Sequence, residues 1–417
     1  MTVSKKIWAL FLILALLVHL PLGVNAQEEA GEPELISEGA VLMDASTGQI
    51  LYGKNMDEQL YPASITKIMT GYLALKYGNP SDELTLSQAV VDQVPRTSSH
   101  ISLLPGEVIT LEGALYALAL VSANDAAVAI AEYISGSVEA FAELMNQEAE
   151  ALGAHHTHFV NANGMPASDH YTTARDMALI TAEALKMPDF LTYFGGKSYT
   201  LPATNLSDER ELVSKNKFVD GSIECAGLLM SKTGWTSSAL GTLVTAAKQG
   251  STTLIAVAMK SPILEDKYTD TQSLFRYGFE EFQRARLSGS LMAEKMHQQG
   301  MDAQATLEGY SPVDVLLPKD VDSKDVMITV PGGFDASLGL STVPVSVDVQ
   351  REEGGRLHIT DLLLTIVDAQ PLSLEDPEPV ETASVSGTAV HPGFIILLVL
   401  AVLFALGRIV FRRKVHP

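Results

Sequence analysis

Apolar residues recur every three or four positions in four alanine-rich stretches in the first half of the chain. This spacing places apolar side chains along one side of a helix. The predicted helices are Ile65 to Lys76, Leu111 to Val121, Asp125 to Ile134 and Val138 to Leu152. A later stretch, Leu274 to Phe279, predicts one more helix that closes this part of the chain.

Alternating apolar and polar residues predict strands on both sides of the helical stretches. A hairpin is expected from Ala40 to Asp44 and from Ile50 to Tyr52, with Ser46-Thr-Gly48 as its turn. The later predicted strands are Gly227 to Thr236, Gly241 to Ala247 and Thr252 to Met259. Strands on both sides of a helical insert indicate an α/β (α+β) fold, in which one antiparallel sheet is covered by an inserted helical layer.

Short β segments dominate the chain after residue 289. They are Val313 to Leu317, Val326 to Val330, Val343 to Val349 and Leu357 to Leu364. They predict a separate, small β-rich domain at 289–367. Its neighbours are a main domain at 35–285 and a stretch at 368–392 that is rich in Pro, Glu, Ser and Thr and is a predicted flexible linker.

Both ends of the chain carry long apolar runs. Residues 1–26 contain Lys5 and Lys6, then an apolar run, then Val24-Asn-Ala26, which is the pattern of a secretory signal peptide. The alternative is an uncleaved anchor, which the short apolar run disfavours. An acidic leader, 27–34, follows.

The C-terminal run, 393–411, carries Arg408 as its one charge and is followed by Arg412, Arg413 and Lys414. Its length suits one transmembrane helix, and the basic tail 412–417 favours the cytoplasmic side. We therefore expect a single-pass C-terminal membrane anchor, with the rest of the chain on the extracytoplasmic face.

Charge and cysteine content limit the possible partners and the possible covalent cross-links. The formal net charge is -22, and setting aside the six basic residues of the two terminal segments leaves -28 for 27–392. So acidic a surface repels nucleic acid, which is therefore not an expected partner. Cys225 is the one cysteine, so no intramolecular disulfide can form, and we interpret it as a small buried hydrophobic residue.

The first polar motif is Ser64-Ile-Thr-Lys67 at the start of a predicted helix. Residues three apart are neighbours on a helix, and Lys67 is the only charge from Ser64 to Leu75. Gly71 and Ala74 continue this face, which predicts close packing around the lysine. A desolvated lysine has a lowered pKa and can accept the proton of an attacking serine. The simpler alternative is a capping serine before a surface lysine.

The second motif, Ser122-Ala-Asn124, interrupts two predicted helices. Residues two apart share a side only in extended backbone, so a short non-helical link would direct Ser122 and Asn124 to one point. We expect Asp125 to cap the next helix. A plain capped turn between helices is the alternative.

The third motif, Lys232-Thr-Gly234, lies in a predicted strand with Trp235 and Thr236. Lys232 can offer positive charge to a carboxylate, and the hydroxyls of Thr233 and Thr236 can donate hydrogen bonds. Gly234 leaves room for a substrate backbone to approach the strand. A strand-end turn is the simpler alternative, but the simple alternatives for all three motifs would have to hold together.

Taken together, the three motifs resemble those of the serine D-Ala-D-Ala carboxypeptidases, the low-molecular-mass penicillin-binding proteins of peptidase family S11. The strings that carry the resemblance are Tyr61-Pro-Ala-Ser-Ile-Thr-Lys-Ile-Met-Thr70, Val121-Ser-Ala-Asn-Asp-Ala126, Lys232-Thr-Gly-Trp-Thr236 and His170-Tyr-Thr-Thr-Ala-Arg-Asp-Met177. The resemblance covers roughly 35–285. It implies a penicillin-recognising serine transferase fold and removal of the terminal D-alanine from peptidoglycan stem peptides, with β-lactams as covalent inhibitors.

Site roles follow from the resemblance by motif. Ser64 would be the acylated nucleophile and Lys67 its base, while Ser122 and Lys232 would pass a proton to the leaving D-alanine. Substrate would be held by Asn124, Thr233, Gly234, Trp235 and Thr236, with the N–H groups of Ser64 and Trp235 as the oxyanion hole. Asn161-Ala-Asn-Gly-Met-Pro166 follows the family only loosely, and Trp235 is bulky for its place.

No cofactor is expected, because this chemistry needs none. His155, His156 and His158 lack a partner at a metal-binding spacing, so no metal site is predicted.

Three other functions remain open. A β-lactamase shares the motifs, although no E-x-x-L-N-like string lies between Ser122 and Lys232. A non-catalytic penicillin-binding sensor would need a signalling domain, and only 412–417 follow the predicted span. A D,D-endopeptidase or transpeptidase would use the same nucleophile, and the sequence does not separate these activities from a carboxypeptidase.

Overall fold

The computed structural model describes residues 32–298, 312–329, 342–350 and 356–365. The predicted signal peptide, linker, transmembrane helix and tail lie outside these residues, as does most of the leader. All described residues belong to one compact unit, Met1–Asp368. Within the described ranges, no helix combines the length and the apolar character that crossing a membrane requires.

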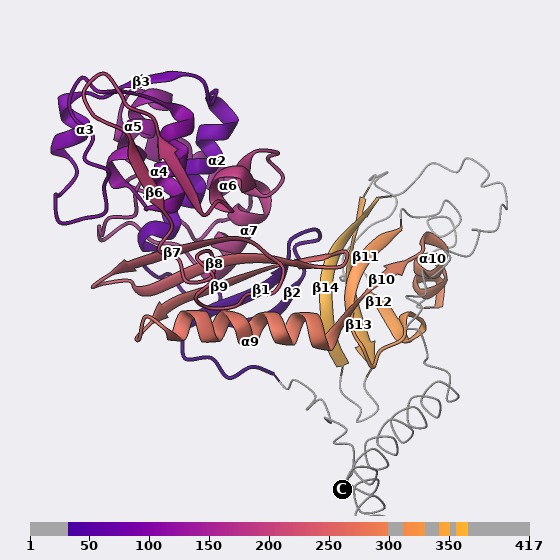
Figure 1. Cartoon of the computed structure of the whole chain (residues 1–417). Coiled ribbons are helices and arrows are strands. Elements are labelled where there is room, and N and C mark those ends of the chain that lie inside the picture. The colour runs from indigo at the N-terminus through magenta and orange to yellow at the C-terminus, as the bar shows by residue number, and fades with distance from the viewer. Residues whose placement is uncertain (1–31, 299–311, 330–341, 351–355, 366–417) are drawn as a thin grey trace, which may run out of the picture. The chain divides into compact units, whose positions relative to one another are not determined.

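A five-stranded antiparallel sheet lies at the centre of the main domain, in the order β2-β1-β9-β8-β7 (Figure 1). Its strands are β1 (Gly39–Asp44), β2 (Ile50–Lys54), β7 (Leu228–Thr236), β8 (Leu240–Gln249) and β9 (Thr252–Ser261). β1 pairs with β9, so the N-terminal hairpin joins the later strands in one sheet. The predicted antiparallel sheet is thereby confirmed, with β2 and β7 as its two edge strands.

Helices cover one face of the sheet and belong to the inserted layer. They are α2 (Lys67–Tyr77), α3 (Gln88–Asp92), α4 (Leu111–Leu120), α5 (Asn124–Ser135), α6 (Val138–Ala151), α7 (Ala174–Ala184) and α8 (Phe190–Phe194). Two small hairpins complete the layer: β3 (Glu83–Thr85) with β4 (Val108–Thr110), and β5 (Ser198–Leu201) with β6 (Arg210–Val213). The four predicted helices of this layer are confirmed, whereas α3, α7, α8 and both hairpins were not predicted.

The two faces of the sheet belong to different hydrophobic clusters. Val41 and Met43 pack with the helical layer, whereas Ala40 and Leu42 pack with Leu274 of α9 (Asp266–Glu281). Successive side chains of a strand point to opposite faces, so the alternation along β1 serves both layers. The predicted closing helix is therefore confirmed, and it begins eight residues earlier than the apolar spacing indicated.

The β-rich part of the chain contains one helix that was not predicted, α10 (Gly289–Gln298). Its strands are β10 (Phe282–Leu287), β11 (Val313–Pro318), β12 (Val326–Thr329), β13 (Thr342–Gln350) and β14 (Arg356–Thr365), and a short 3₁₀ turn, η2 (Ser323–Asp325), precedes β12. β10 pairs with β11 and β13 pairs with both β12 and β14. The four predicted β segments are confirmed, and the division into domains stays a prediction, because β10 lies across the predicted boundary.

Candidate active site

Ser64 lies in a single 3₁₀ turn, η1 (Ala63–Thr66), immediately before α2. Its side chain is half-buried, and the preceding residue, Ala63, has a positive φ of 51°. A Cβ atom added at Gly234 of β7 would lie 2.8 Å from the backbone nitrogen of Ser64. The glycine therefore lets the edge strand approach the turn closely, which is the arrangement an oxyanion hole between Ser64 and Trp235 requires.

Lys67 is completely buried and its amino group has three oxygen neighbours. Lys67 Nζ is 3.0 Å from Ser64 Oγ, 2.6 Å from Asn124 Oδ1 and 2.5 Å from the backbone oxygen of Asn163. Burial lowers the pKa of Lys67 well below that of an ordinary lysine, and the positive charge of Lys232 lowers it further, against the opposing effect of Asp125. The expected crowded environment of Lys67 is confirmed.

This geometry decides where the lone pair of a neutral Lys67 points. A neutral amine keeps two N–H groups and one lone pair. The amide oxygen of Asn124 and the peptide oxygen of Asn163 can only accept hydrogen bonds, so each takes one N–H. The lone pair is left facing Ser64 Oγ, which can donate its proton to it.

Ser122 lies in the predicted non-helical link between α4 and α5, whereas Asn124 is the first residue of α5. Ser122 has a φ of 59°, in the left-handed region that residues other than glycine rarely adopt. Lys232 Nζ donates to Ser122 Oγ at 2.9 Å, so the second and third motifs meet across the site. Strained backbone at this link is consistent with a functional position.

The predicted capping role of Asp125 is wrong. The N-cap of α5 is Ala123, which offers no side-chain hydrogen bond. The Asp125 carboxylate instead accepts the backbone N–H groups of Ile101 and Leu103, both at 3.1 Å, and that of Ala126 at 3.0 Å. Ile101 and Leu103 lie in a loop far from Asp125 in sequence, so the local pattern does not reveal these two contacts.

The three motifs share one groove of about 390 Å³. Among the predicted site residues, its lining includes Ser64, Ser122, Lys232, Thr233, Gly234 and Trp235. Lys67 and Asn124 are not part of the lining, and both side chains are buried. Thr236 is not part of the lining, and its hydroxyl accepts the N–H of Ala239 at 2.9 Å.

Lys267, in the first turn of α9, also lines the groove and was missed in the sequence. It is buried, and its Nζ is 3.4 Å from the backbone oxygen of Gly234. Burial lowers its pKa to about 8. Burial and the charge of Lys267 in turn lower the pKa of Lys232 to about 7. No motif marks Lys267, because only the packing of α9 against the sheet brings it to the groove.

The loop 161–166 and His170 both contact the catalytic turn η1. A Cβ atom at Gly164, whose φ is 82°, would lie 1.9 Å from the backbone oxygen of Ala63. His170 Nδ1 accepts the N–H of Val160 at 3.1 Å, so its Nε2 carries the proton and donates to Thr66 Oγ1 at 3.0 Å. Burial lowers the pKa of His170 to about 4, so this histidine stays neutral.

Two remaining sequence interpretations concern Cys225 and the histidines between 155 and 158. Cys225 is half-buried and packs beside two hydrophobic clusters, and burial raises its pKa to about 11. His155 pairs with Glu150, and His158 contacts the backbone oxygen of Asp169.

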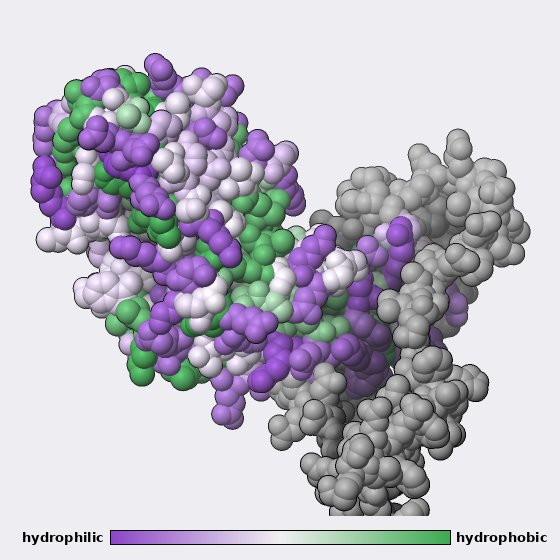
Figure 2. Space-filling model, in the orientation of Figure 1, coloured by the Kyte–Doolittle hydropathy of each residue, from purple (hydrophilic) through white to green (hydrophobic). Residues whose placement is uncertain are grey.

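In Figure 2, hydrophobic residues reach the surface in separate patches among hydrophilic ones. Trp235, beside the groove, is 59% exposed.

Known proteins are similar to this chain in both sequence and fold. The family model described as D-alanyl-D-alanine carboxypeptidase matches residues 26–262, which include all three motifs. D-alanyl-D-alanine carboxypeptidase DacF of Bacillus subtilis is 32% identical over 335 residues, 77% of this chain and 84% of that protein.

Two solved structures extend the comparison. The Streptomyces K15 DD-transpeptidase is 30% identical with a TM-score of 0.56, and the match covers 60% of this chain and 98% of that one. Penicillin-binding protein 6B of Escherichia coli is 25% identical with a TM-score of 0.61, and the match covers 80% and 96%. The second match extends beyond the region of the three motifs.

Proposed function

The chain belongs to the D-alanyl-D-alanine carboxypeptidase family, and from this premise we propose that it removes the terminal D-alanine of peptidoglycan stem peptides through an acyl-enzyme on Ser64. One observation carries the assignment of roles. The buried amine of Lys67 is 3.0 Å from Ser64 Oγ, and its other two oxygen neighbours can only accept. A lysine held in this way is a general base for the serine hydroxyl.

In the first half of the reaction, Ser64 Oγ attacks the carbonyl carbon of the penultimate D-alanine while its proton passes to Lys67. Negative charge develops on the carbonyl oxygen. We expect the N–H groups of Ser64 and Trp235 to stabilise it, and the close approach of β7 to the catalytic turn at Gly234 supports this role. The C–N bond then breaks and an ester on Ser64 remains.

The leaving D-alanine needs a proton on its amine. Ser122 can donate it, and Lys232 Nζ, at 2.9 Å from Ser122 Oγ, can restore the proton to Ser122. Water then attacks the ester carbonyl and gives a proton through Ser122 to Lys232, while Lys67 returns its proton to Ser64 Oγ as the ester C–O bond breaks. The shortened stem peptide departs and each group regains its starting protonation. The scheme needs no metal and no cofactor.

The terminal carboxylate of the substrate is expected to bind at the end of the groove that contains buried lysines. Lys232 and Lys267 both line the groove there, together with the hydroxyl of Thr233. Hydrogen bonds to a charged group are stronger than neutral ones, which favours substrates with a free C-terminal carboxylate. This charge supports a carboxypeptidase over an endopeptidase, whose substrates continue beyond the scissile bond.

We place the catalytic domain on the extracytoplasmic face of the cell membrane, held by the apolar segment 393–411. The support is the sequence pattern of both chain ends. β-Lactams are expected to acylate Ser64, because they mimic an acylating substrate that the same groove admits. A β-lactamase activity is not favoured, since the sequence between Ser122 and Lys232 contains no E-x-x-L-N-like string that would supply a base for rapid deacylation.

Release of D-alanine from a soluble peptide ending in D-Ala-D-Ala tests the proposal. The wild type should release D-alanine, and Ser64→Ala should abolish release while leaving the fold intact. Hydrolysis of an internal D-Ala cross-link in preference to the free terminus would instead indicate an endopeptidase. Folded wild-type protein that releases nothing would refute the carboxypeptidase.

A further inference from the structure

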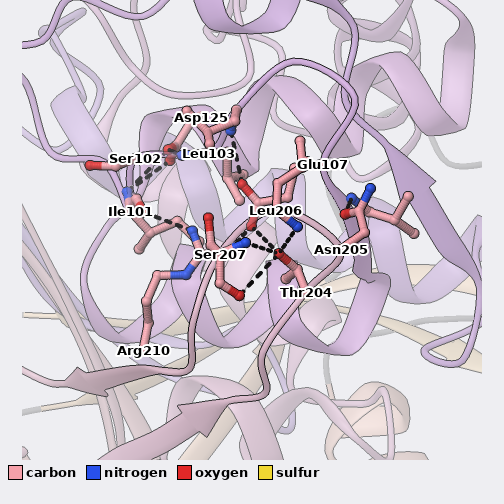
Figure 3. Close-up of polar contacts among 12 residues, drawn as sticks. Ile101, Ser102, Leu103, Glu107, Asp125, Thr204, Asn205, Leu206, Ser207 and Arg210 are labelled. Atoms are coloured by element: carbon pink, nitrogen blue, oxygen red, sulfur yellow. Dashed lines mark hydrogen bonds and ion pairs between the residues drawn. The ribbon is translucent and has the colours of Figure 1, made fainter.

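A cluster of polar residues joins one wall of the groove to β6, outside the catalytic motifs (Figure 3). Arg210, the first residue of β6, donates from Nη1 to the backbone oxygen of Ile101 at 3.0 Å and forms an ion pair with Glu107. The side chain of Arg210 is 18% exposed and that of Glu107 is fully buried. Such a pair is costly to break, because the partner that remains keeps a buried charge without compensation.

Glu107 holds the same loop at a second point. Its Oε2 accepts the N–H of Leu104 at 2.9 Å, and its Oε1 accepts the hydroxyl of Thr204 at 2.9 Å. Figure 3 shows Glu107 between Thr204 and the loop that carries Leu103. The carboxylate therefore links the loop before β4 to the segment before β6.

The loop is also bonded to the start of α5, on its other side. The Asp125 carboxylate accepts the backbone N–H of Ile101 at 3.1 Å, and Arg210 donates to the backbone oxygen of the same residue. Two residues earlier, the backbone oxygen of Ser99 accepts the N–H of Asn124 at 2.8 Å. Ser99 itself lines the groove.

These contacts form a continuous path from Arg210 to the nucleophile. Arg210 fixes the loop, the loop fixes the backbone of Asn124, and Asn124 Oδ1 accepts from Lys67 Nζ at 2.6 Å. Catalytic groups lose much of their effect when they move by about 1 Å. A shift of Asn124 would turn the lone pair of Lys67 away from Ser64.

We propose that Arg210, together with Glu107, is a positioning residue for acylation: the pair holds the wall segment 99–103 so that Asn124 keeps Lys67 aligned with Ser64. Arg210 touches neither Ser64 nor Lys67 in this arrangement and acts through the loop. The proposal rests on the proposed function for the identity of the reaction. It adds the Arg210–Glu107 ion pair, which lies outside the three motifs, to the residues that acylation requires.

The test compares Arg210→Met with wild type in the full chain. A fluorescent penicillin first counts the competent sites, and single-turnover acylation then gives the rate per competent site. We expect this rate to fall by about tenfold or more, with a smaller change in the half-saturating penicillin concentration. Arg210→Lys should recover part of the rate, because it keeps the charge beside Glu107.

A second ion pair in the same protein provides a matched control. Arg284 and Asp44 have the same exposed fractions as the first pair, 18% and 0%, and their contact joins β10 to β1, away from the groove. Nε is a buried atom without a partner in both arginines. Arg284→Met should therefore lower the thermal stability to a similar degree and leave the acylation rate per site unchanged.

Glu107→Gln tests the pair from its other side, in case Arg210→Met does not fold. It keeps an oxygen for the N–H of Leu104 and loses the charge that holds Arg210, so its acylation rate should also fall. Wild-type rates per site in folded Arg210→Met or Glu107→Gln would overturn the proposal, as would an equal loss of rate in Arg284→Met.

The readout also separates this proposal from the proposed function. If the wild type is acylated by penicillin but releases no D-alanine, the carboxypeptidase fails, and the acylation rates still decide the role of Arg210. A wild type that penicillin does not acylate would overturn both.

Discussion

At the residue scale, three buried lysines of the candidate active site differ in pKa. The pKa of Lys67 lies well below the ordinary value, that of Lys232 is about 7 and that of Lys267 is about 8. The lowered pKa of Lys67 suits this lysine to accept a proton, while Lys267, with a pKa of about 8, is mostly charged near neutral pH and can hold a carboxylate. Burial is the largest cause of each lowered pKa, and the charges of neighbouring lysines lower the pKa values of Lys67 and Lys232 further.

The pH dependence of substrate binding follows from these values. A lysine is charged below its pKa, so the charge at the carboxylate end of the groove is lost as pH rises through about 7 and 8. We expect KM for a D-Ala-D-Ala peptide to rise roughly tenfold or more between pH 7 and 9, because a hydrogen bond to a charged group contributes about 1.5 to 3 kcal/mol. Steady-state kinetics across this range measures the change.

Lys267→Arg provides the control for the pH dependence, since a guanidinium stays charged throughout the range. The rise of KM should become smaller in this variant. A KM that does not change from pH 7 to 9 in either protein would show that these lysines do not bind the carboxylate.

Trp235 gives a second prediction at this scale. The chain has two tryptophans, and the other, Trp8, lies in the predicted signal peptide. Trp235 is 59% exposed at the groove, so a ligand bound there covers the indole. Acylation by a β-lactam should therefore shift the intrinsic fluorescence to shorter wavelength at the rate of acylation. Ser64→Ala cannot be acylated, so it should lack this fluorescence change. An unchanged spectrum in the acylated wild type would place the ligand away from Trp235.

At the scale of elements, the site exists because three elements approach one another without side chains between them. The turn η1 meets β7 at Gly234 and meets the loop 161–166 at Gly164. At each place, a Cβ atom would collide with the backbone of the turn. The catalytic serine is thus fixed by backbone contacts from both sides.

Gly164→Ala should damage the site more than a glycine substitution elsewhere. The change forces a positive φ on alanine, at about 1 to 2 kcal/mol, and pushes a methyl group into the backbone of Ala63, at about 1 to 3 kcal/mol more. Gly136→Ala is the matched control, since its φ is also positive, 79°, and no atom lies within 4 Å of its added Cβ. Chemical denaturation and acylation rates measure both effects. Equal losses of stability in the two variants would contradict the close approach at Gly164.

Sequence pattern was sufficient for elements whose contacts follow local spacing. The stripe Ile65, Ile68 and Met69 is fully buried as predicted, and the strands of the main sheet followed their alternation. The hairpin of β3 and β4 joins segments far apart in sequence, each three residues long, so no periodic signal exists for it. Asp125 was assigned to a cap for the same reason, since its acceptor role depends on a loop that only the tertiary fold brings near.

At the scale of the whole molecule, the β-rich region contributes to the packing of the main domain. Leu316 of β11 is buried in one cluster with Leu35 and Leu42. The side-chain amide of Gln49 donates to the backbone oxygen of Leu316 and accepts its N–H, both at 2.7 Å. The sequence predicted a separate domain here because its periodicity changes, but periodicity contains no information about contacts between neighbouring regions.

A chain that ends at Leu287 should therefore keep its chemistry and lose stability. The groove takes its lining from residues 64 to 268, so D-alanine release per competent site should match the full chain. Gln49 and β10 would lose their partners and Leu42 would lose its contact with Leu316, so the free energy of unfolding should fall by several kcal/mol.

Gln49→Ala in the full chain separates the two contributions, because it keeps the β-rich region and removes one link. Its cost should be about 1 to 3 kcal/mol, since the backbone groups of Leu316 are left buried without partners. Denaturant unfolding compares the three proteins, and site titration normalises their D-alanine release. If the folded, shortened chain acylates normally but releases D-alanine slowly, the β-rich region must act on the reaction itself, because lost stability alone lowers the number of competent sites and not the rate at each one.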